Sequence, residues 1–134
     1  MTTATRKGLA QWHALATSPD PERLARLVAA DAVFHSPVVH SPQQGRALVV
    51  AYLSAAAATL GQGQFRYVRE IVDGENAMLE FTCVLDDIKV NGVDIITFDE
   101  GGNITDFKVM IRPIKAVNKV WEMMAAQLGT ARGS

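Results

Sequence analysis

The sequence has no surplus of charge of either sign and very little cysteine. Lysine and arginine number 13 against 14 aspartates and glutamates, so the net charge is −1 at pH 7. Proteins that bind nucleic acid or anionic lipid usually carry a basic excess, so neither partner is expected. Cys83 is the single cysteine. With one cysteine, the chain can form neither an internal disulfide nor a zinc site built from several cysteines.

Long hydrophobic runs and a targeting segment are also missing. Arg6 and Lys7 are not followed by an apolar run, so they do not indicate a signal peptide. The longest apolar stretch without charge runs from Ala47 to Leu60 and has 14 residues. A membrane-spanning helix needs ~20 residues. We therefore predict a cytoplasmic protein without a membrane partner.

Two further absences concern bound groups. No G-x-G-x-x-G or Walker-type segment occurs, so no loop for a nucleotide phosphate is predicted. His13, His35 and His40 do not have the spacing of a recognisable metal site. We expect no metal and no cofactor.

The composition itself is that of one globular domain. The chain has 134 residues, of which 49% are hydrophobic and 20% charged. We predict a single domain over residues 1–134 that is ordered from about residue 5 to residue 128. No pattern follows Gly129, so the tail 129–134 is expected to be disordered.

Apolar residues recur at helical spacing in four segments. These cover residues 5–16, the stretch after Asp20-Pro21, residues 48–60 and residues 114–128. Aspartate is a preferred N-cap and proline fits the first helical position, so Asp20 and Pro21 mark the start of the second helix. The last helix has one apolar stripe, which consists of Ile114, Val117, Val120, Trp121, Met124 and Leu128.

From Gln64 onward the hydrophobic period changes to two residues, which predicts strands. Turn signals at Asp73–Asn76, Asn91–Gly92 and Asp99–Asn103 divide this region into four strands. A further short strand is expected over residues 32–36. The sequence thus predicts an α+β fold in which helices cover one face of a curved antiparallel sheet.

This order of elements, together with the segment ADAVFHSPV at residues 30–38, resembles the nuclear transport factor 2-like superfamily, in its SnoaL-like and ketosteroid-isomerase-like branch. The resemblance covers roughly residues 6–112. It implies a cone-shaped sheet, or cystatin-like roll, whose pocket is closed by three N-terminal helices, with a C-terminal helix added. It also implies a small apolar ligand and a homodimer formed through the outer face of the sheet.

Ketosteroid isomerases provide the comparison for the site. Their carboxylate base precedes the proline of a D-P-V-G segment, a position that falls on Ser36 here. Their oxyanion-binding tyrosine falls on Trp12, and their protonated aspartate falls on Asp94. Of the three ketosteroid-isomerase site residues, this chain therefore has only the aspartate, and the carboxylate base is absent.

Two other branches of the superfamily fit the sequence less well. Limonene epoxide hydrolases use an R-x-D segment, which does not occur in this chain. SnoaL-like cyclases use an aspartate late in a strand, and residues 107–112 contain no carboxylate.

The candidate catalytic residues are Asp94 and His40. Facing an apolar pocket, Asp94 would stay protonated and could donate a hydrogen bond to a ligand carbonyl or oxyanion. Otherwise it is a solvated carboxylate where a strand begins. His40 is either a base at the pocket rim or a surface histidine.

The expected ligand-binding residues are Trp12, Phe34, Ser36, Tyr52, Phe81 and Phe107. Each of the aromatic ones can equally be a core residue. Phe98, Val109 and Met110 are expected in the core or the pocket wall. Cys83 alternates with buried residues and is predicted to be an inert core thiol.

Two functions follow from these residues. The first is an isomerase, cyclase or lyase that acts on an apolar carbonyl compound by proton transfer. The second is a non-catalytic domain that binds a small hydrophobic ligand or a second copy of itself. The first function requires a group in the pocket that can accept a proton near pH 7, and the second does not. His40 is the residue predicted to accept it.

Overall fold

The computed structural model describes residues 1–131, with side chains described as far as Leu128. Within this part of the chain, four helices and six strands form an α+β fold. Their order is α1 (Thr3–Thr17), α2 (Pro21–Leu27), β1 (Val28–His35), β2 (Gln43–Gln44), α3 (Arg46–Leu60), β3 (Arg66–Asp73), β4 (Asn76–Leu85), β5 (Ile88–Phe98), β6 (Ile104–Arg112) and α4 (Ile114–Ala131).

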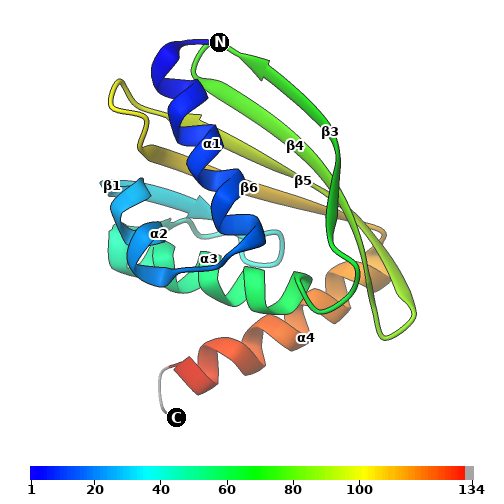
Figure 1. Cartoon of the computed structure of the whole chain (residues 1–134). Helices are drawn as coiled ribbons and strands as arrows, with labels where there is room; N and C mark the ends of the chain where they lie inside the picture. The colour runs from blue at the N-terminus through cyan, green and yellow to red at the C-terminus, as the bar shows by residue number, and fades with distance from the viewer. Residues whose placement is uncertain (132–134) are drawn as a thin grey trace.

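The strands form one curved, open sheet in the order β2-β1-β6-β5-β4-β3. The segment from β3 to β6 is an antiparallel meander, as the sequence predicts, whereas β1 pairs with β6 in parallel. Helices α1, α2 and α3 lie against the concave face of this sheet, and α4 packs against α3 at one end (Figure 1). This arrangement confirms the predicted cone.

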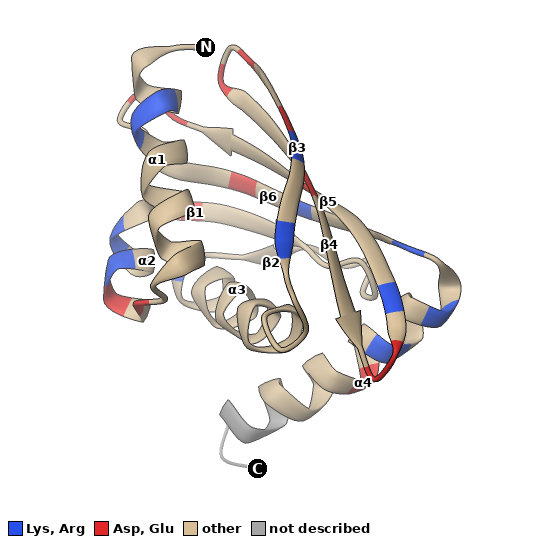
Figure 2. Ribbon diagram, turned by 45° about the vertical axis from the view of Figure 1, so that its right-hand side comes forward, with Lys and Arg blue, Asp and Glu red and all other residues tan. Residues whose placement is uncertain are grey.

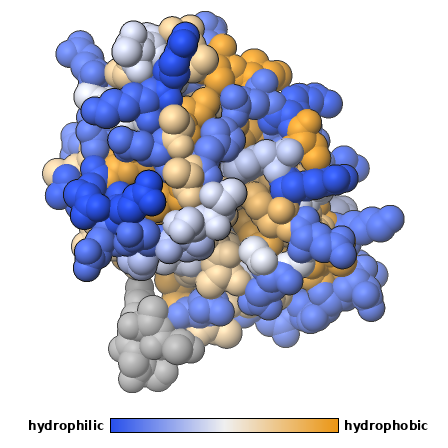
Figure 3. Space-filling view, viewed as in Figure 1, coloured by the Kyte–Doolittle hydropathy of each residue, from blue (hydrophilic) through white to orange (hydrophobic). Residues whose placement is uncertain are grey.

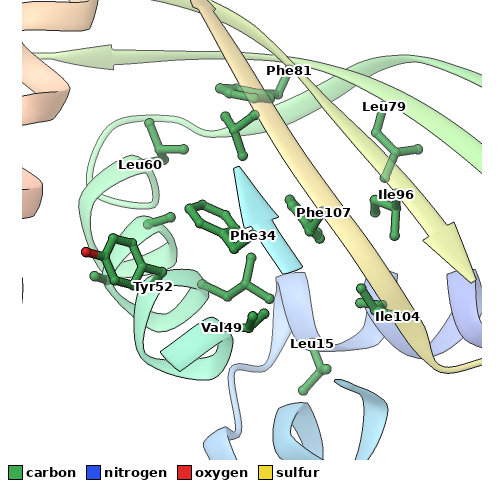
Figure 4. Packing of buried hydrophobic residues seen from close by; sticks show 14 of the residues in the cluster. Leu15, Phe34, Val49, Tyr52, Leu60, Leu79, Phe81, Ile96, Ile104 and Phe107 are labelled. Atoms are coloured by element: carbon green, nitrogen blue, oxygen red, sulfur yellow. The ribbon is translucent and has the colours of Figure 1, made fainter. Parts of the chain in front are cut away.

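The core lies between the concave face of the sheet and these helices. Alternate residues of each strand point inward because side chains alternate across a sheet. Phe34, Leu79, Phe81, Ile96 and Phe107 are almost completely buried there (Figure 4). Burial of such side chains is the main favourable contribution to folding, roughly 2 kcal/mol for each.

Local signals fix the start of α2 as predicted. The Asp20 side chain accepts hydrogen bonds from the backbone N–H groups of Glu22 and Arg23, and Pro21 is the first helical residue. The expected hairpin at Asp73–Asn76 is also present, since β3 ends at Asp73 and β4 begins at Asn76.

The predicted turn at Asn91–Gly92 is wrong. Both residues lie inside β5, and the chain reverses instead at Asp86 and Asp87, whose φ angles are +48° and +65°. Aspartate tolerates this left-handed conformation better than most residues do. Gly92 has a different role: a Cβ there would collide with the Phe81 ring and would lie 2.7 Å from the Met110 carbonyl oxygen.

Three other expectations need correction. Met110 points to the outer face of the sheet and is 50% exposed, so it is not part of the core. Ile114 and Trp121 are exposed, although Val120 and Met124 of the same predicted stripe are buried. The early strand begins at Val28 rather than at residue 32.

The C-terminal helix reaches Ala131, beyond the predicted end at residue 128. The rest of the tail predicted to be disordered, residues 132–134, lies outside the described residues. Among the helices described, none is both long enough and apolar enough to span a membrane.

Candidate functional site

The candidate site is centred on Asp94, in the middle of β5. Its side chain is on the concave face of the sheet and is 5% exposed, and no other carboxylate in the described residues is buried. Its partners on the neighbouring strands are Leu79 and Val109, both apolar and buried. The carboxyl group therefore lies in the interior of the cone, and it is not a solvated carboxylate at the start of a strand.

Two side chains connect Asp94 to helix α1. The Tyr67 hydroxyl donates a hydrogen bond of 2.6 Å to Asp94 Oδ2, and the Trp12 indole N–H donates one of 3.0 Å to the Tyr67 oxygen. An indole N–H can only donate, so the Tyr67 proton is directed to Asp94. The three residues thus form a row of two hydrogen bonds, in which Trp12 donates to Tyr67 and Tyr67 donates to the Asp94 carboxyl group.

The second carboxyl oxygen of Asp94 is left for another partner. No hydrogen bond to Oδ1 is present among the described residues, whereas Oδ2 is held by Tyr67. Thr59 Oγ1 is the one fully enclosed side-chain polar atom without a partner in this part of the chain. Oδ1 therefore keeps some accessible surface, through which a ligand could approach it.

Burial changes the protonation of this group. Removal from water raises the pKa of Asp94 from 3.8 to about 7, and the hydrogen bond from Tyr67 opposes this rise. The pKa of Tyr67 is raised well above its ordinary value, first by burial and then by the neighbouring Asp94 charge. Tyr67 therefore remains a neutral donor, while Asp94 can gain or lose a proton near neutral pH.

Aromatic side chains surround the hydrogen-bonded chain. The Trp12 and Phe107 rings are 4.9 Å apart, and Phe65 lies 5.1 Å from both Tyr67 and Phe81. Gly92 allows the Phe81 ring to lie over β5 two residues before Asp94. These contacts keep the surroundings of Asp94 apolar, which is why burial dominates its pKa.

A polar pair lies beside this aromatic cluster. The His13 ring is edge-on to Tyr67 with 5.7 Å between the ring centroids, and its Nε2 is 2.6 Å from Glu70 Oε1. Both side chains are about two-fifths exposed. The cluster therefore changes from apolar to polar at His13 and Glu70.

The structure brings some of the predicted site residues together. The aromatic cluster around Tyr67 and Asp94 includes Trp12, Phe81 and Phe107. Phe34 and Tyr52 are buried in the core between β1 and α3, with 5.7 Å between their ring centroids, and the Phe34 ring also lies 6.1 Å from that of Phe107 (Figure 4).

Ser36 and His40 lie apart from this cluster. Both follow β1 in the loop that leads to β2, and the Ser36 hydroxyl accepts a hydrogen bond of 3.2 Å from the Val38 N–H. His40 is exposed, and no hydrogen bond or ring contact joins it to another described residue. Because the loop carries His40 to the surface, the structure does not place it as a base inside the cone.

Sequence reasoning missed Tyr67, although a signal for it exists. A buried carboxyl group almost always has a hydrogen-bond partner. Tyr67 pairs with Phe81 across β3 and β4, and Asp94 pairs with Leu79 across β4 and β5. A long tyrosine side chain can therefore reach over β4, but this becomes visible only when the register of the three strands is known.

Comparisons with known proteins identify the family and the fold. A family model described as a SnoaL-like domain matches residues 9–107. A steroid delta-isomerase from Pseudomonas aeruginosa is 32% identical, with a TM-score of 0.93 over 100% of this chain and 98% of the other. A protein with a cystatin-like fold from Silicibacter pomeroyi is 31% identical, with a TM-score of 0.84 over 93% and 87%.

A third structure shares the fold at lower identity. It is a nuclear transport factor 2-like protein of unknown function from Mesorhizobium loti, 22% identical, with a TM-score of 0.71 over 82% of this chain and 92% of the other. The search of curated proteins gives no match.

Proposed function

The chain belongs to the SnoaL-like family of the nuclear transport factor 2-like superfamily, and from this premise we propose that it isomerises a small apolar carbonyl compound by proton transfer. The observation that carries the proposal is the state of Asp94. One of its oxygens is fixed by Tyr67, the other has no partner among the described residues, and its pKa is about 7. Such a group can act as base and as acid in one turnover.

The reaction moves a proton between two carbons. Ionised Oδ1 takes the proton from the carbon between the carbonyl group and a β,γ double bond. The C–H electron pair forms a new C=C bond, and the carbonyl π pair moves to oxygen to give a dienolate. Asp94 then returns the proton to the γ carbon, the carbonyl group re-forms, and the double bond becomes conjugated. Asp94 ends ionised as it began, so no co-reactant is needed.

Tyr67 and Trp12 have supporting roles in this proposal. The Tyr67 hydroxyl stabilises the ionised form of Asp94 and keeps the pKa of the carboxyl from rising further. Trp12 orients the Tyr67 hydroxyl by donating to its oxygen. The surrounding aromatic rings exclude water and suit a flat, apolar substrate. The likeness to a steroid delta-isomerase supports the same substrate class.

The alternative is binding without turnover. It is favoured by the positions of Ser36 and His40, since neither supplies a second proton-transfer group beside Asp94. In this alternative the neutral carboxyl group donates a hydrogen bond from Oδ1 to a ligand carbonyl. Binding would then weaken as pH rises through 7, because the ionised form of Asp94 can no longer donate.

The test is an assay with a steroid that carries a 3-keto group and a double bond at carbon 5. Isomerisation produces a conjugated enone, which is followed by its ultraviolet absorbance. We expect kcat/KM to rise with pH around 7. Asp94→Asn should lower it by about 10²–10⁴-fold, the usual contribution of a general acid–base group. Tyr67→Phe should move the midpoint of the pH profile upward, because the hydrogen bond that lowers the pKa is lost.

Asp31→Asn provides the matched control, since Asp31 is an exposed carboxylate on β1. It should leave kcat/KM unchanged. Absence of turnover together with saturable binding that weakens above pH 7 would establish the alternative. Absence of both turnover and binding would contradict both functions for this ligand class.

We also propose that the protein is a homodimer formed through the outer face of the sheet. Ile71, Met78 and Met110 are exposed there by 55%, 42% and 50%. With neighbouring residues they line a groove of about 360 Å³ that also includes Arg69, Glu80 and Arg112. Because this surface carries apolar side chains and both signs of charge, two copies related by a two-fold axis could be complementary.

A further inference from the structure

A second concave surface lies beside helix α1, with the core residue Leu15 in its wall. It is a groove of about 360 Å³ between α1, α2 and the turn that joins β5 to β6. We call it the basic groove; its lining residues are Lys7, Gln11, Leu15, Arg23, Arg26 and the turn residues 101–103. Lysine and arginine on α1 and α2 are seen on one side of the molecule in Figure 2.

Helical spacing accounts for the convergence of these side chains. Lys7 and Gln11 are four residues apart on α1, and Arg23 and Arg26 are three apart on α2, so each pair shares one helix face. The two helices contact one another. Strongly hydrophilic side chains therefore gather over α1 and α2, as the space-filling view shows (Figure 3).

The third wall of the basic groove is fixed to both helices. The Asn103 side-chain amide donates to the Arg26 carbonyl oxygen at 2.8 Å, which joins the turn to the end of α2. On the other side Gly8 of α1 packs directly on the backbone of Gly102, where a Cβ at either position would collide. The groove is therefore built from three connected elements rather than from independent surface side chains.

The cations of the basic groove lack a counter-charge within the described part of the chain. No carboxylate lies within ion-pair distance of Lys7, Arg23 or Arg26. The turn has two acidic residues: Asp99 uses Oδ1 to accept from the N–H groups of Gly101 and Asn103, and Glu100 is exposed and is not ion-paired with these cations. Three converging positive charges repel one another, and a bound anion would relieve this repulsion.

We propose that the basic groove binds a small phosphate-bearing molecule. Two arginines offer planar forks of donors that match phosphate oxygens, and Lys7 adds a point charge. The Gln11 amide adds a neutral donor. Leu15, which is almost buried, gives the groove an apolar part that could contact the organic portion of a phosphate ester. The volume falls in the range of small-molecule sites.

The test is isothermal titration calorimetry of the full chain with inorganic pyrophosphate as the probe. We expect saturable binding of one pyrophosphate per chain that weakens as sodium chloride is added. Arg26→Gln and Lys7→Gln should each lower the affinity by about tenfold or more, the effect of one charge-assisted hydrogen bond. Both side chains are exposed, and circular dichroism would verify that the variants fold.

Arg66→Gln is the matched control, because Arg66 is an exposed arginine on β3 that lines neither this groove nor the one on the outer face of the sheet. Its affinity for pyrophosphate should equal that of the unchanged chain. Absence of saturable binding, or equal affinity in Arg26→Gln, would overturn the proposal. Equally tight binding of succinate would overturn the assignment to phosphate. The Asp94→Asn variant should still bind pyrophosphate, so this result is independent of the proposed isomerase activity.

Discussion

At the scale of single residues, Asp94 lies where a neutral carboxyl group is favoured over a carboxylate. Its pKa rises from 3.8 in water to about 7 in the folded chain. The neutral form therefore contributes stability that is complete below pH ~4 and is lost as pH rises toward 7. The full difference corresponds to about 4 kcal/mol at most. The same burial that suits Asp94 to proton transfer thus costs stability at neutral pH.

Asp94→Asn should make this cost visible. Asparagine can still accept the hydrogen bond from Tyr67, and it carries no charge at any pH. We expect the variant to be more stable than the unchanged chain at pH 8, by about 1–4 kcal/mol. The advantage should disappear near pH 4. Urea unfolding at both pH values measures it, and an advantage that is equal at the two pH values would contradict the raised pKa.

The sequence predicted the individual residues of the site unevenly. Asp94 and Trp12 were identified through the family resemblance, and the structure joins them. Tyr67, which joins them, could not be identified because its role depends on reaching across β4. For His40 the sequence left two alternatives, a base at the pocket rim and a surface histidine, and in the structure its side chain is exposed.

At the scale of elements, the hairpin of β4 and β5 shows why a strong local signal can mislead. An Asn-Gly pair is among the clearest hairpin signals. Here Gly92 is needed inside the strand because the Phe81 ring occupies the space of its side chain. Packing between strands decided the position of the turn, and such packing is not readable from neighbouring residues. The periodic helices and the other two turns, which depend on local patterns, were predicted correctly.

Gly92→Ala tests this account of the hairpin. The added methyl group must displace Phe81 and approach the Met110 carbonyl oxygen, so we expect a loss of about 1–3 kcal/mol in unfolding free energy. Gly101→Ala is the control, since its Cβ would meet nothing closer than 3.3 Å and its φ is not left-handed. It should change stability far less. Equal effects of the two variants in urea unfolding would contradict the packing role of Gly92.

At the scale of the whole molecule, the two faces of the sheet have different properties. The concave face is covered by helices, and the outer face leaves large apolar side chains in contact with solvent. Exposed apolar groups that cluster usually mark an interaction surface. The fold class and the strand meander could be predicted from the sequence. The homodimer is implied by the family resemblance alone and stays a prediction, because it depends on a partner surface.

Met78→Lys should separate the proposed dimer into monomers. The exposed methionine lies on the outer sheet face, and two buried lysines near a two-fold axis would repel one another. Light scattering coupled to size-exclusion chromatography would measure the mass. Val39→Lys, at another exposed apolar residue, should leave the dimer intact. A monomeric unchanged chain, or a Met78→Lys variant that remains dimeric, would contradict this interface.

The parallel pairing of β1 with β6 has a consequence for the order of folding. Val28 lies beside Ile104 and Phe34 beside Phe107, although the residues of each pair are about 75 positions apart in the sequence. Contacts between residues so distant in sequence form slowly, because a long loop must close first. During synthesis, the hairpins of β3, β4 and β5 can form as they emerge, while Phe34 still lacks its contact with Phe107. The hydrophobic core is therefore completed only when the ribosome has released β6 and then α4, whose Val120 and Met124 are also buried in it.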